Sequence, residues 1–248
     1  MRTLKLTVAY DGTNYCGFQR QANGLSVQEV LEDALAPFER DAAGRGPTVS
    51  GAGRTDAGVH ALGQVASVNV AFETPASAVQ RALNARLPAD VRVVGAVDAT
   101  PGFHARHHAR GKSYRYRVST PPVQSPFDRL YAWHAPGRYD LDAMRAAAEA
   151  LVGRHDFKSF QARGSAVRHT VRTMRTIAIT TPPGEIVFEV EGDGFLRHMV
   201  RAVVGTLLDV GTGLRQPADM AAILEARDRA AAGPTAPAHG LTLVAVTY

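Results

Sequence analysis

The stretch SVQEVLEDALAPF, residues 26–38, decides the fold of the first half of the chain, because it predicts a helix with one apolar face. Ser26 and Glu29 form a capping box, a pattern with which helices begin. The apolar side chains then recur every three or four residues, as on one side of a helix: Val27, Val30, Leu31, Ala34, Leu35 and Phe38. We therefore expect an amphipathic helix that packs on a sheet.

Strand patterns surround this helix. Before it, residues 4–10 alternate between apolar and polar side chains, which is typical of a half-buried strand. After it, the sequence predicts strands near 48–52 and 63–70, a helix from Pro75 and a strand at 91–97. The order strand, helix, strand, strand, helix, strand is the split βαβ or ferredoxin-like order.

The second half repeats this order more loosely. Its predicted elements are a strand at 114–118, a helix at 141–151, a hairpin at 171–191, helices at 195–210 and from about Pro217, and a strand at 241–248. We therefore predict an α+β fold of two ferredoxin-like halves, whose mixed, mainly antiparallel sheets meet at a central cleft. The boundary is expected in the stretch 99–111, which gives an N-terminal half of residues 1–105 and a C-terminal half of residues 106–248.

The composition is that of an ordinary folded protein. Of the 248 residues, 45 % are hydrophobic and 21 % are charged, which argues against disordered, collagen-like and coiled-coil classes. No run approaches the roughly 18 consecutive apolar residues of a membrane span, and the first residues alternate instead of forming a signal peptide. The single Cys16 can form no internal disulfide. We expect a cytoplasmic protein with no membrane partner.

The positive charge is concentrated in one part of the chain. Residues 100–175 hold 14 Lys and Arg against 5 Asp and Glu, a net charge of +9, whereas the whole chain has +5. All cations except Lys5, Lys112 and Lys158 are arginines, whose planar guanidinium binds phosphate and stacks on bases. Coding bias would explain part of the arginine excess but not the clustering. The pattern predicts a polyanionic partner and favours a nucleic acid.

The most unusual segment is SGAGRTDAGVHA, residues 50–61, between two predicted strands. Its glycines allow close backbone approach, and Arg54 and Asp56 place a cation and a carboxylate two residues apart on an irregular loop. A neighbouring cation favours the charged carboxylate that a nucleophile or base needs at neutral pH. From the residues alone, a turn in which Asp56 bonds to the backbone and Arg54 pairs with another acid is equally expected.

Several other chemistries lack their motifs. The loop is no P-loop, and Asp56 stands where the dinucleotide fingerprint requires a third glycine. The chain has no G-x-S-x-G motif of the serine hydrolases. Neither Asp56 with His60 nor the histidines at 104, 107 and 108 complete a zinc pattern. We therefore expect no cofactor and no metal site, and we interpret the histidines as nucleic-acid contacts or as a solvated loop.

A second candidate site is the segment GKSYRYR, residues 111–117, in which basic and aromatic side chains alternate. On a strand, one face would be aromatic and the other cationic. Tyr114 would then stack on a base while the arginines meet phosphates. The alternative is that the tyrosines belong to the core, which is equally expected for Tyr116.

The loop from Gly53 to His60 resembles that of the TruA family, the tRNA pseudouridine synthases that act on the anticodon arm. Five further motifs resemble the family in the same order: YDGTNYCGFQRQ at 10–21, FHAR at 103–106, KSYRY at 112–116, FLRHMVR at 195–201 and APAHGL at 236–241. Six ordered motifs over nearly the whole chain make a chance similarity very improbable. One departure is Ala202, where many relatives have asparagine after the arginine.

The resemblance implies an isomerase that converts uridine to pseudouridine at tRNA positions 38, 39 and 40, with no cofactor and no metal. It identifies Asp56 with the essential aspartate, which either attacks the ribose or abstracts a ribose proton. Arg54 would pair with Asp56 and hold the flipped nucleotide. Tyr114 would pack on the target uracil, and Leu241 would line the same pocket. A uridine in a stem must be flipped out to react, which such a pocket suits.

The resemblance also implies partners. Family members form homodimers that bind tRNA, and the expected tRNA contacts here are His104, Arg106, Arg110, Lys112, Arg115 and Arg197. Two alternatives follow from the residues alone. A non-catalytic RNA-binding or RNA-folding protein would use the basic segment and ignore Asp56. An RNA glycosidase or nuclease would use Asp56 as a base, but the chain lacks an evident second acid and a metal set.

Overall fold

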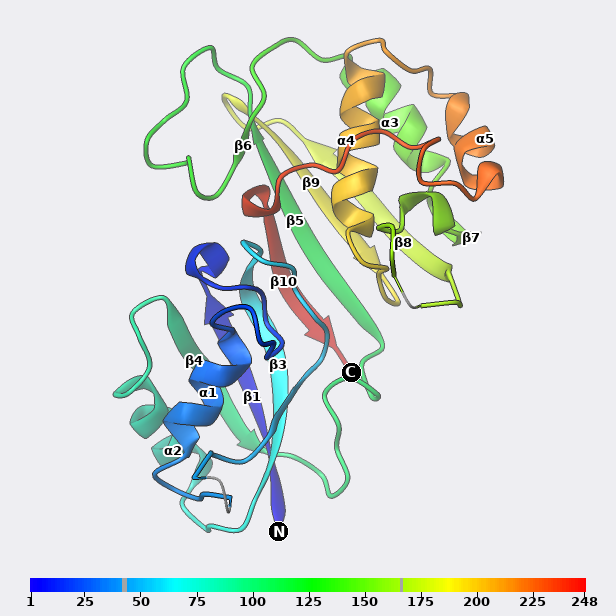
Figure 1. Ribbon diagram of the computed structural model, residues 1–248. Coiled ribbons are helices and arrows are strands. Elements are labelled where there is room, and N and C mark those ends of the chain that lie inside the picture. The colour runs from blue at the N-terminus through cyan, green and yellow to red at the C-terminus, as the bar shows by residue number, and fades with distance from the viewer. Residues whose placement is uncertain (42–43, 166) are drawn as a thin grey trace. The chain divides into compact units, whose positions relative to one another are not determined.

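The computed structural model describes residues 1–41, 44–165 and 167–248, which fold as a mixed α+β chain (Figure 1). The chain divides into two compact units, residues 1–110 with 243–248 and residues 111–242. The sequence places the boundary five residues earlier and assigns the whole C-terminus to the second half. Residues 243–248 join the first unit because the last strand lies beside its sheet, a pairing that no local pattern announces.

The first unit holds a sheet with two helices. Its elements are β1 (Arg2–Tyr10), α1 (Val27–Leu35), β2 (Val49–Gly51), β3 (His60–Val70), α2 (Ala76–Asn84) and β4 (Val91–Asp98), with a 3-10 turn at Gly12–Asn14. β1 lies between β4 and β3 and is antiparallel to both, and β2 pairs with β3. The alternating side chains of β1 therefore contribute every second residue to the core, as Leu4, Leu6 and Val8 show.

The helix that the capping box predicts is α1. The Ser26 hydroxyl accepts a hydrogen bond from the Glu29 N–H at 3.2 Å, so the helix begins where the sequence indicates. Four residues of the expected apolar face are buried, namely Val27, Leu31, Ala34 and Leu35, while Val30 and Phe38 are half-buried. The helix ends at Leu35, two residues before Pro37, because a proline has no backbone N–H to donate to the preceding turn.

The second unit is built on an antiparallel sheet. Its elements are β5 (Gly111–Ser119), β6 (Trp133–His134), α3 (Leu141–Glu149), β7 (Gly153–Asp156), β8 (Val171–Thr180), β9 (Glu185–Gly192), α4 (Met199–Gly211) and α5 (Asp219–Ala226), and β10 (Leu241–Thr247) begins in it. β5, β9, β8 and β7 follow one another across the sheet, and the short β6 pairs parallel with β5. The predicted hairpin is confirmed as β8 and β9.

Two details differ from the sequence expectation. The expected helix 195–210 begins only at Met199, because His198 has a left-handed φ of +62° and breaks the helical backbone. β6 and β7 were not expected, since two and four residues are too short for a recognisable alternation. Ala202 is fully buried inside α4. In the described part of the chain, no helix combines the length and apolarity that crossing a membrane requires.

Candidate active site

Asp56 lies in the loop between β2 and β3, in the first unit, and is half-buried. Its carbonyl accepts a hydrogen bond from the Val59 N–H at 3.1 Å. Gly58, inside this turn, has a φ of +76°, a conformation that glycine adopts without strain. A tight turn therefore fixes the backbone next to the Asp56 side chain.

Thr55, the residue before Asp56, is held in place by the sheet of the first unit. Thr55 is buried, and its hydroxyl lies 2.8 Å from the Tyr10 hydroxyl on β1. Burial raises the pKa of Tyr10 to about 12, with hydrogen bonding to Thr55 and Gln64 acting in the opposite direction, so this phenol is neutral at physiological pH. Gln64, on β3, donates to the Gly53 carbonyl at 3.0 Å. Two strands of the sheet thus position the loop through buried side chains.

The loop is also held from one flank by residues that precede α1. The Phe18 N–H donates to the Thr55 carbonyl at 3.2 Å, and the Gly58 N–H donates to the Tyr15 carbonyl at 3.3 Å. Gly17 has a φ of +95°, and a Cβ there would lie 2.4 Å from the Thr55 oxygen. No side chain fits in that space, so the two backbones approach as closely as glycine alone allows.

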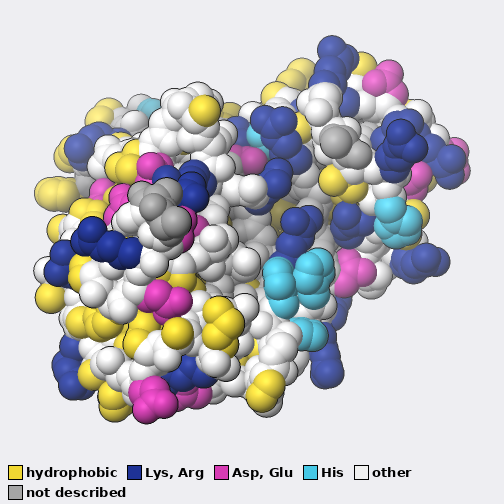
Figure 2. All heavy atoms as spheres, turned by 60° about the horizontal axis from the view of Figure 1, so that its bottom comes forward, with side chains coloured by type: hydrophobic (Ala, Val, Ile, Leu, Met, Phe, Trp, Pro, Cys, Tyr) yellow, Lys and Arg dark blue, Asp and Glu magenta, His cyan; other side chains and the backbone are white. Residues whose placement is uncertain are grey.

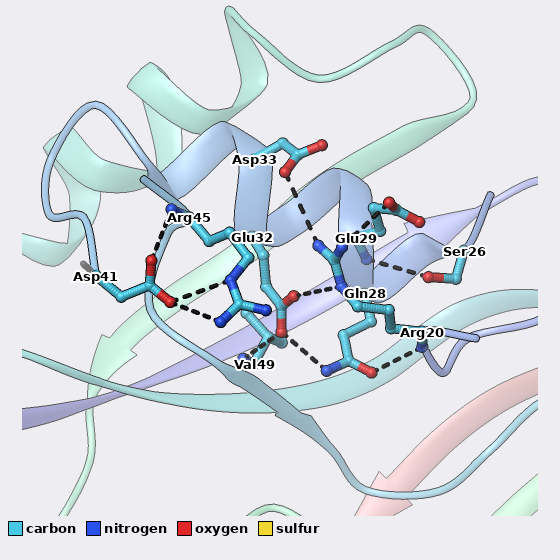
Figure 3. Close-up of polar contacts among 9 residues, drawn as sticks. All are labelled: Arg20, Ser26, Gln28, Glu29, Glu32, Asp33, Asp41, Arg45 and Val49. Atoms are coloured by element: carbon cyan, nitrogen blue, oxygen red, sulfur yellow. Dashed lines mark hydrogen bonds and ion pairs between the residues drawn. The ribbon is translucent and has the colours of Figure 1, made fainter. Parts of the chain in front are cut away.

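This flank is itself anchored to α1 by a charged network (Figure 3). Arg20 donates to Glu29 at 3.1 Å and to Glu32 at 3.0 Å. The other carboxylate oxygen of Glu32 accepts from the Val49 N–H at 3.0 Å and from Gln28 at 2.8 Å. The Glu32 side chain is only 8 % exposed, so these are charge-assisted bonds with little solvent competition. The network joins α1, β2 and the flanking segment.

Arg54 differs from the expectation. It is exposed, and within the described residues no ion pair joins it to Asp56 or to another carboxylate. Arg54 therefore stays available to an incoming anion.

Tyr114 and Leu241, the other expected substrate contacts, belong to the second unit. Tyr114 lies on β5 opposite Val190 and is 8 % exposed. Its ring meets that of Phe195 edge to face, with 5.2 Å between the centroids and 88° between the planes. This contact with Phe195 restrains the ring plane of Tyr114.

The core alternative for the second tyrosine is confirmed. Tyr116 is fully buried, and its hydroxyl donates to the Pro237 carbonyl at 2.8 Å. A Cβ at Gly240 would lie 2.5 Å from the Tyr116 ring, so glycine is required where the chain passes the ring. Leu241 follows at once and is buried at the start of β10. Tyr116 thus positions the backbone that carries Leu241.

The opposite face of β5 is cationic, as expected, but its arginines are paired. Arg115 donates to Glu189 on the neighbouring strand at 3.1 and 2.8 Å, and Arg117 pairs with Glu185 and with Asp128. To contact a phosphate, Arg115 would therefore have to give up its bonds to Glu189. Lys112 is half-buried at the start of the strand.

The histidines of 104–108 form a compact surface group in the first unit, and Figure 2 shows histidine side chains (cyan) gathered together. The rings of His104 and His107 lie 4.2 Å apart. His104 Nδ1 accepts from the Arg106 N–H at 3.1 Å, and desolvation together with its positively charged neighbours lowers the pKa of His104. Arg106 and Arg110 are exposed beside this group. Nowhere in residues 1–41, 44–165 and 167–248 do three His, Cys, Asp or Glu side chains converge as metal ligands.

Sequence reasoning missed the residues that support the loop from behind. Tyr10 and Gly17 lie in the motif at 10–21, yet nothing local indicates that they contact Thr55. Gln64 and Glu32 look like ordinary polar positions of a strand and a helix. Their burial becomes visible only once the first unit is folded.

The chain was also compared with known proteins. A family model described as tRNA pseudouridine synthase matches residues 6–107 and 147–248. Proteins named tRNA pseudouridine synthase A are 46 % identical in Pelobacter propionicus and 45 % in Geobacter sulfurreducens, over all of both chains. The Myxococcus xanthus protein of that name is 47 % identical over all of this chain and 92 % of its own length.

Among solved structures, "Crystal Structure of a Cbf5-Nop10-Gar1 Complex" aligns at 14 % identity and a TM-score of 0.37, over 83 % of this chain and 45 % of that one. This likeness is too low to inform the fold. The family model and the full-length relatives are decisive by themselves. On their evidence, and with the Asp56 loop built as described, the chain belongs to the tRNA pseudouridine synthase family.

Proposed function

We propose that this protein is an isomerase that converts uridine to pseudouridine in tRNA. The observation that carries the proposal is the Asp56 loop, held rigidly by two strands and a glycine-rich flank, in a chain that matches synthases of this kind over its full length. A protein that only binds RNA would not need the carboxylate of Asp56 to be held in a fixed position.

The reaction breaks the bond between uracil N1 and ribose C1′, turns the uracil and forms a bond between C5 and C1′. The C5 proton leaves and N1 gains one, so no atom is added or lost overall. Asp56 acts on the ribose, either by attack at C1′ or by removal of the C2′ proton. A carboxylate serves both routes, and in each it must be ionised and must reach the sugar.

The other site residues act on the nucleotide. The exposed Arg54 holds the flipped nucleotide through its phosphate, since no carboxylate of the described residues pairs with it. Tyr114 packs on the uracil and accepts the C5 proton late in the reaction. Leu241 supplies an apolar wall that excludes water. Extraction of the base from its stack costs a few kcal/mol, which stacking and phosphate contacts offset.

We propose further that the RNA is bound through its anticodon arm, with target uridines at positions 38, 39 and 40. Contacts with its backbone come from His104, Arg106, Arg110, Lys112, Arg115 and Arg197, of which Arg106, Arg110 and Arg197 are exposed. The working form is a homodimer in the cytoplasm, as the family resemblance implies. No cofactor or metal takes part.

The direct test uses an unmodified tRNA transcript with uridines at positions 38–40 and a control transcript with cytidines there. After incubation, each RNA is digested to nucleosides and also run on a urea gel. We expect pseudouridine from the first RNA alone, with both RNAs intact. Tight binding without pseudouridine would indicate the RNA-binding alternative, and free uracil or shortened RNA would indicate a glycosidase or nuclease.

A further inference from the structure

The second unit contains an arginine-lined pocket that includes none of the residues expected to touch the uracil. It has a volume of about 560 Å³ and opens to solvent. Its walls come from the segment after α5, which crosses α4 (Figure 1), and from the residues before α4. The lining side chains that matter here are Arg163, Arg197, Asp209, Arg215 and Arg229.

The pocket is built by contacts that hold its walls together. The Ala162 N–H donates to the Arg197 carbonyl at 2.9 Å, which fixes residue 163 beside the start of α4. On the other side, the Gly233 N–H donates to the Thr206 hydroxyl at 2.9 Å. A Cβ at Gly205 would lie 2.0 Å from the Pro234 oxygen, so the crossing segment lies directly on the helix. The arginines therefore converge on a firm backbone.

One of the four arginines is neutralised within the protein. Arg215 donates to Asp209 at 3.1 Å and to the Ala231 carbonyl at 2.9 Å. This pair also ties the end of α4 to the crossing segment. Asp209 thereby uses the one negative charge that lines the pocket, and Arg215 has a structural role.

The remaining three arginines keep their charge without an acidic partner. Arg229 is half-buried and donates to neutral groups, the Thr235 hydroxyl at 2.8 Å and the Ala232 carbonyl at 3.4 Å. Desolvation and the nearby charge of Arg163 lower the pKa of Arg229. Among the described residues, no carboxylate lies within ion-pair distance of Arg163, Arg197 or Arg229. Like charges are therefore held together in one pocket.

We propose that this pocket binds a phosphate group, and that in the working protein the group belongs to the RNA backbone. Guanidinium groups bind phosphate oxygens in bidentate fashion, and a bound anion would relieve the repulsion between Arg163 and Arg229. The open mouth admits a group that is part of a continuous chain. The assignment to RNA rests on the proposed function, whereas the affinity for phosphate does not.

The test compares wild type with Arg163→Ala and Arg229→Ala in the full-length protein. Binding of unmodified tRNA is measured by fluorescence anisotropy at several salt concentrations. Each variant should bind on the order of tenfold more weakly, and the slope of log K against log salt should fall by about 1. Arg145→Ala is the control, because Arg145 is an exposed arginine of the same unit that lies on α3 and pairs with Asp142. It should leave both quantities unchanged.

A second arm uses inorganic phosphate alone, with binding followed by 31P relaxation. Arg163 makes no hydrogen bond in the described structure, so Arg163→Ala remains informative even where Arg229→Ala unfolds. Phosphate bound by wild type and not by Arg163→Ala, with an unchanged tRNA slope, would overturn the assignment to RNA. If both variants show the wild-type slope of log K against log salt for tRNA, and the wild type binds no phosphate, the proposed phosphate site is wrong.

The same samples are assayed for pseudouridine, which separates this inference from the proposed function. Reduced slopes with an inactive wild type would support the pocket and contradict the isomerase. Full activity of wild type with unchanged slopes would contradict RNA binding by the pocket and leave the isomerase supported.

Discussion

At the residue scale, the geometry of the site depends on a few atoms behind Asp56. The backbone of Gly17 packs closely against the Thr55 carbonyl, and the hydroxyl groups of Tyr10 and Thr55 form a hydrogen bond. Neither contact touches the proposed substrate. Both contacts fix the position of the Asp56 carboxylate. Displacing a catalytic group by about 1 Å lowers the rate on the order of 100-fold.

Gly17→Ala should move the loop. The new Cβ would lie 2.4 Å from the Thr55 oxygen, and φ is +95°, so both sterics and backbone strain oppose the change. We expect a loss of roughly 2–4 kcal/mol in unfolding free energy and a lower kcat. Gly44→Ala is the control, because Gly44 has a φ of +77° but no atom of the described residues that the added Cβ would meet lies within 4 Å of it. Urea unfolding measures the stability of each variant, and single-turnover assays measure its rate. Equal losses in the two variants would contradict a specific contact between Gly17 and the loop.

Tyr10→Phe should change how stability depends on pH. Burial raises the pKa of Tyr10 from 10.0 to about 12, so its contribution is complete below pH 10 and is lost as the pH rises through 12. At pH 8 the variant should be about 1 kcal/mol less stable, since Thr55 loses its partner. By pH 11 the wild type should have lost about 1.4 kcal/mol of unfolding free energy that the variant keeps, because Tyr10 ionises more readily in the unfolded chain. Parallel pH profiles in urea unfolding would contradict this.

At the element scale, α1 supports the flank of the site through Glu32. Glu32→Gln keeps the shape but removes the charge that Arg20 and the Val49 N–H share. We expect a loss of about 2 kcal/mol in stability and a lower kcat with little change in KM. Glu29→Gln changes another acid of the same helix that bonds to Arg20, and its side chain is 28 % exposed.

The Glu29 variant should therefore lose well under half as much stability and rate. Chemical denaturation and steady-state assays of the two variants, run side by side, measure the difference. An effect of Glu29→Gln as large as that of Glu32→Gln would mean that surface charge and not the buried bond supports the flank.

Elements with a local cause were predictable from the sequence. The capping box and apolar face of α1 act within a few residues, and the hairpin of β8 and β9 follows from its turn. The start of α4 was not predictable, because it depends on a left-handed His198 within an apolar run. Tyr116 was predicted on the right strand, but its burial depends on Gly240, far along the chain.

At the whole-molecule scale, the sequence predicts the candidate residues and the structure adds their surroundings. Asp56 was singled out by the composition of its loop, whereas the lack of an Arg54–Asp56 ion pair among the described residues is seen only in the structure. The pocket of Arg163, Arg197 and Arg229 was invisible, because it exists only where the segment after α5 crosses α4. The net charge of +9 over residues 100–175 indicated the partner without indicating the site.

The proposed function makes Asp56 the group that drives isomerisation in intact RNA. The most direct measurement is tritium release from tRNA labelled at uracil C5, with wild type and Asp56→Asn at equal, saturating concentrations. Wild type should release the label of its target uridines from intact RNA. Asp56→Asn should bind the tRNA equally well and release label at least about 1,000-fold more slowly. Release by Asp56→Asn at a rate near that of wild type would contradict the account.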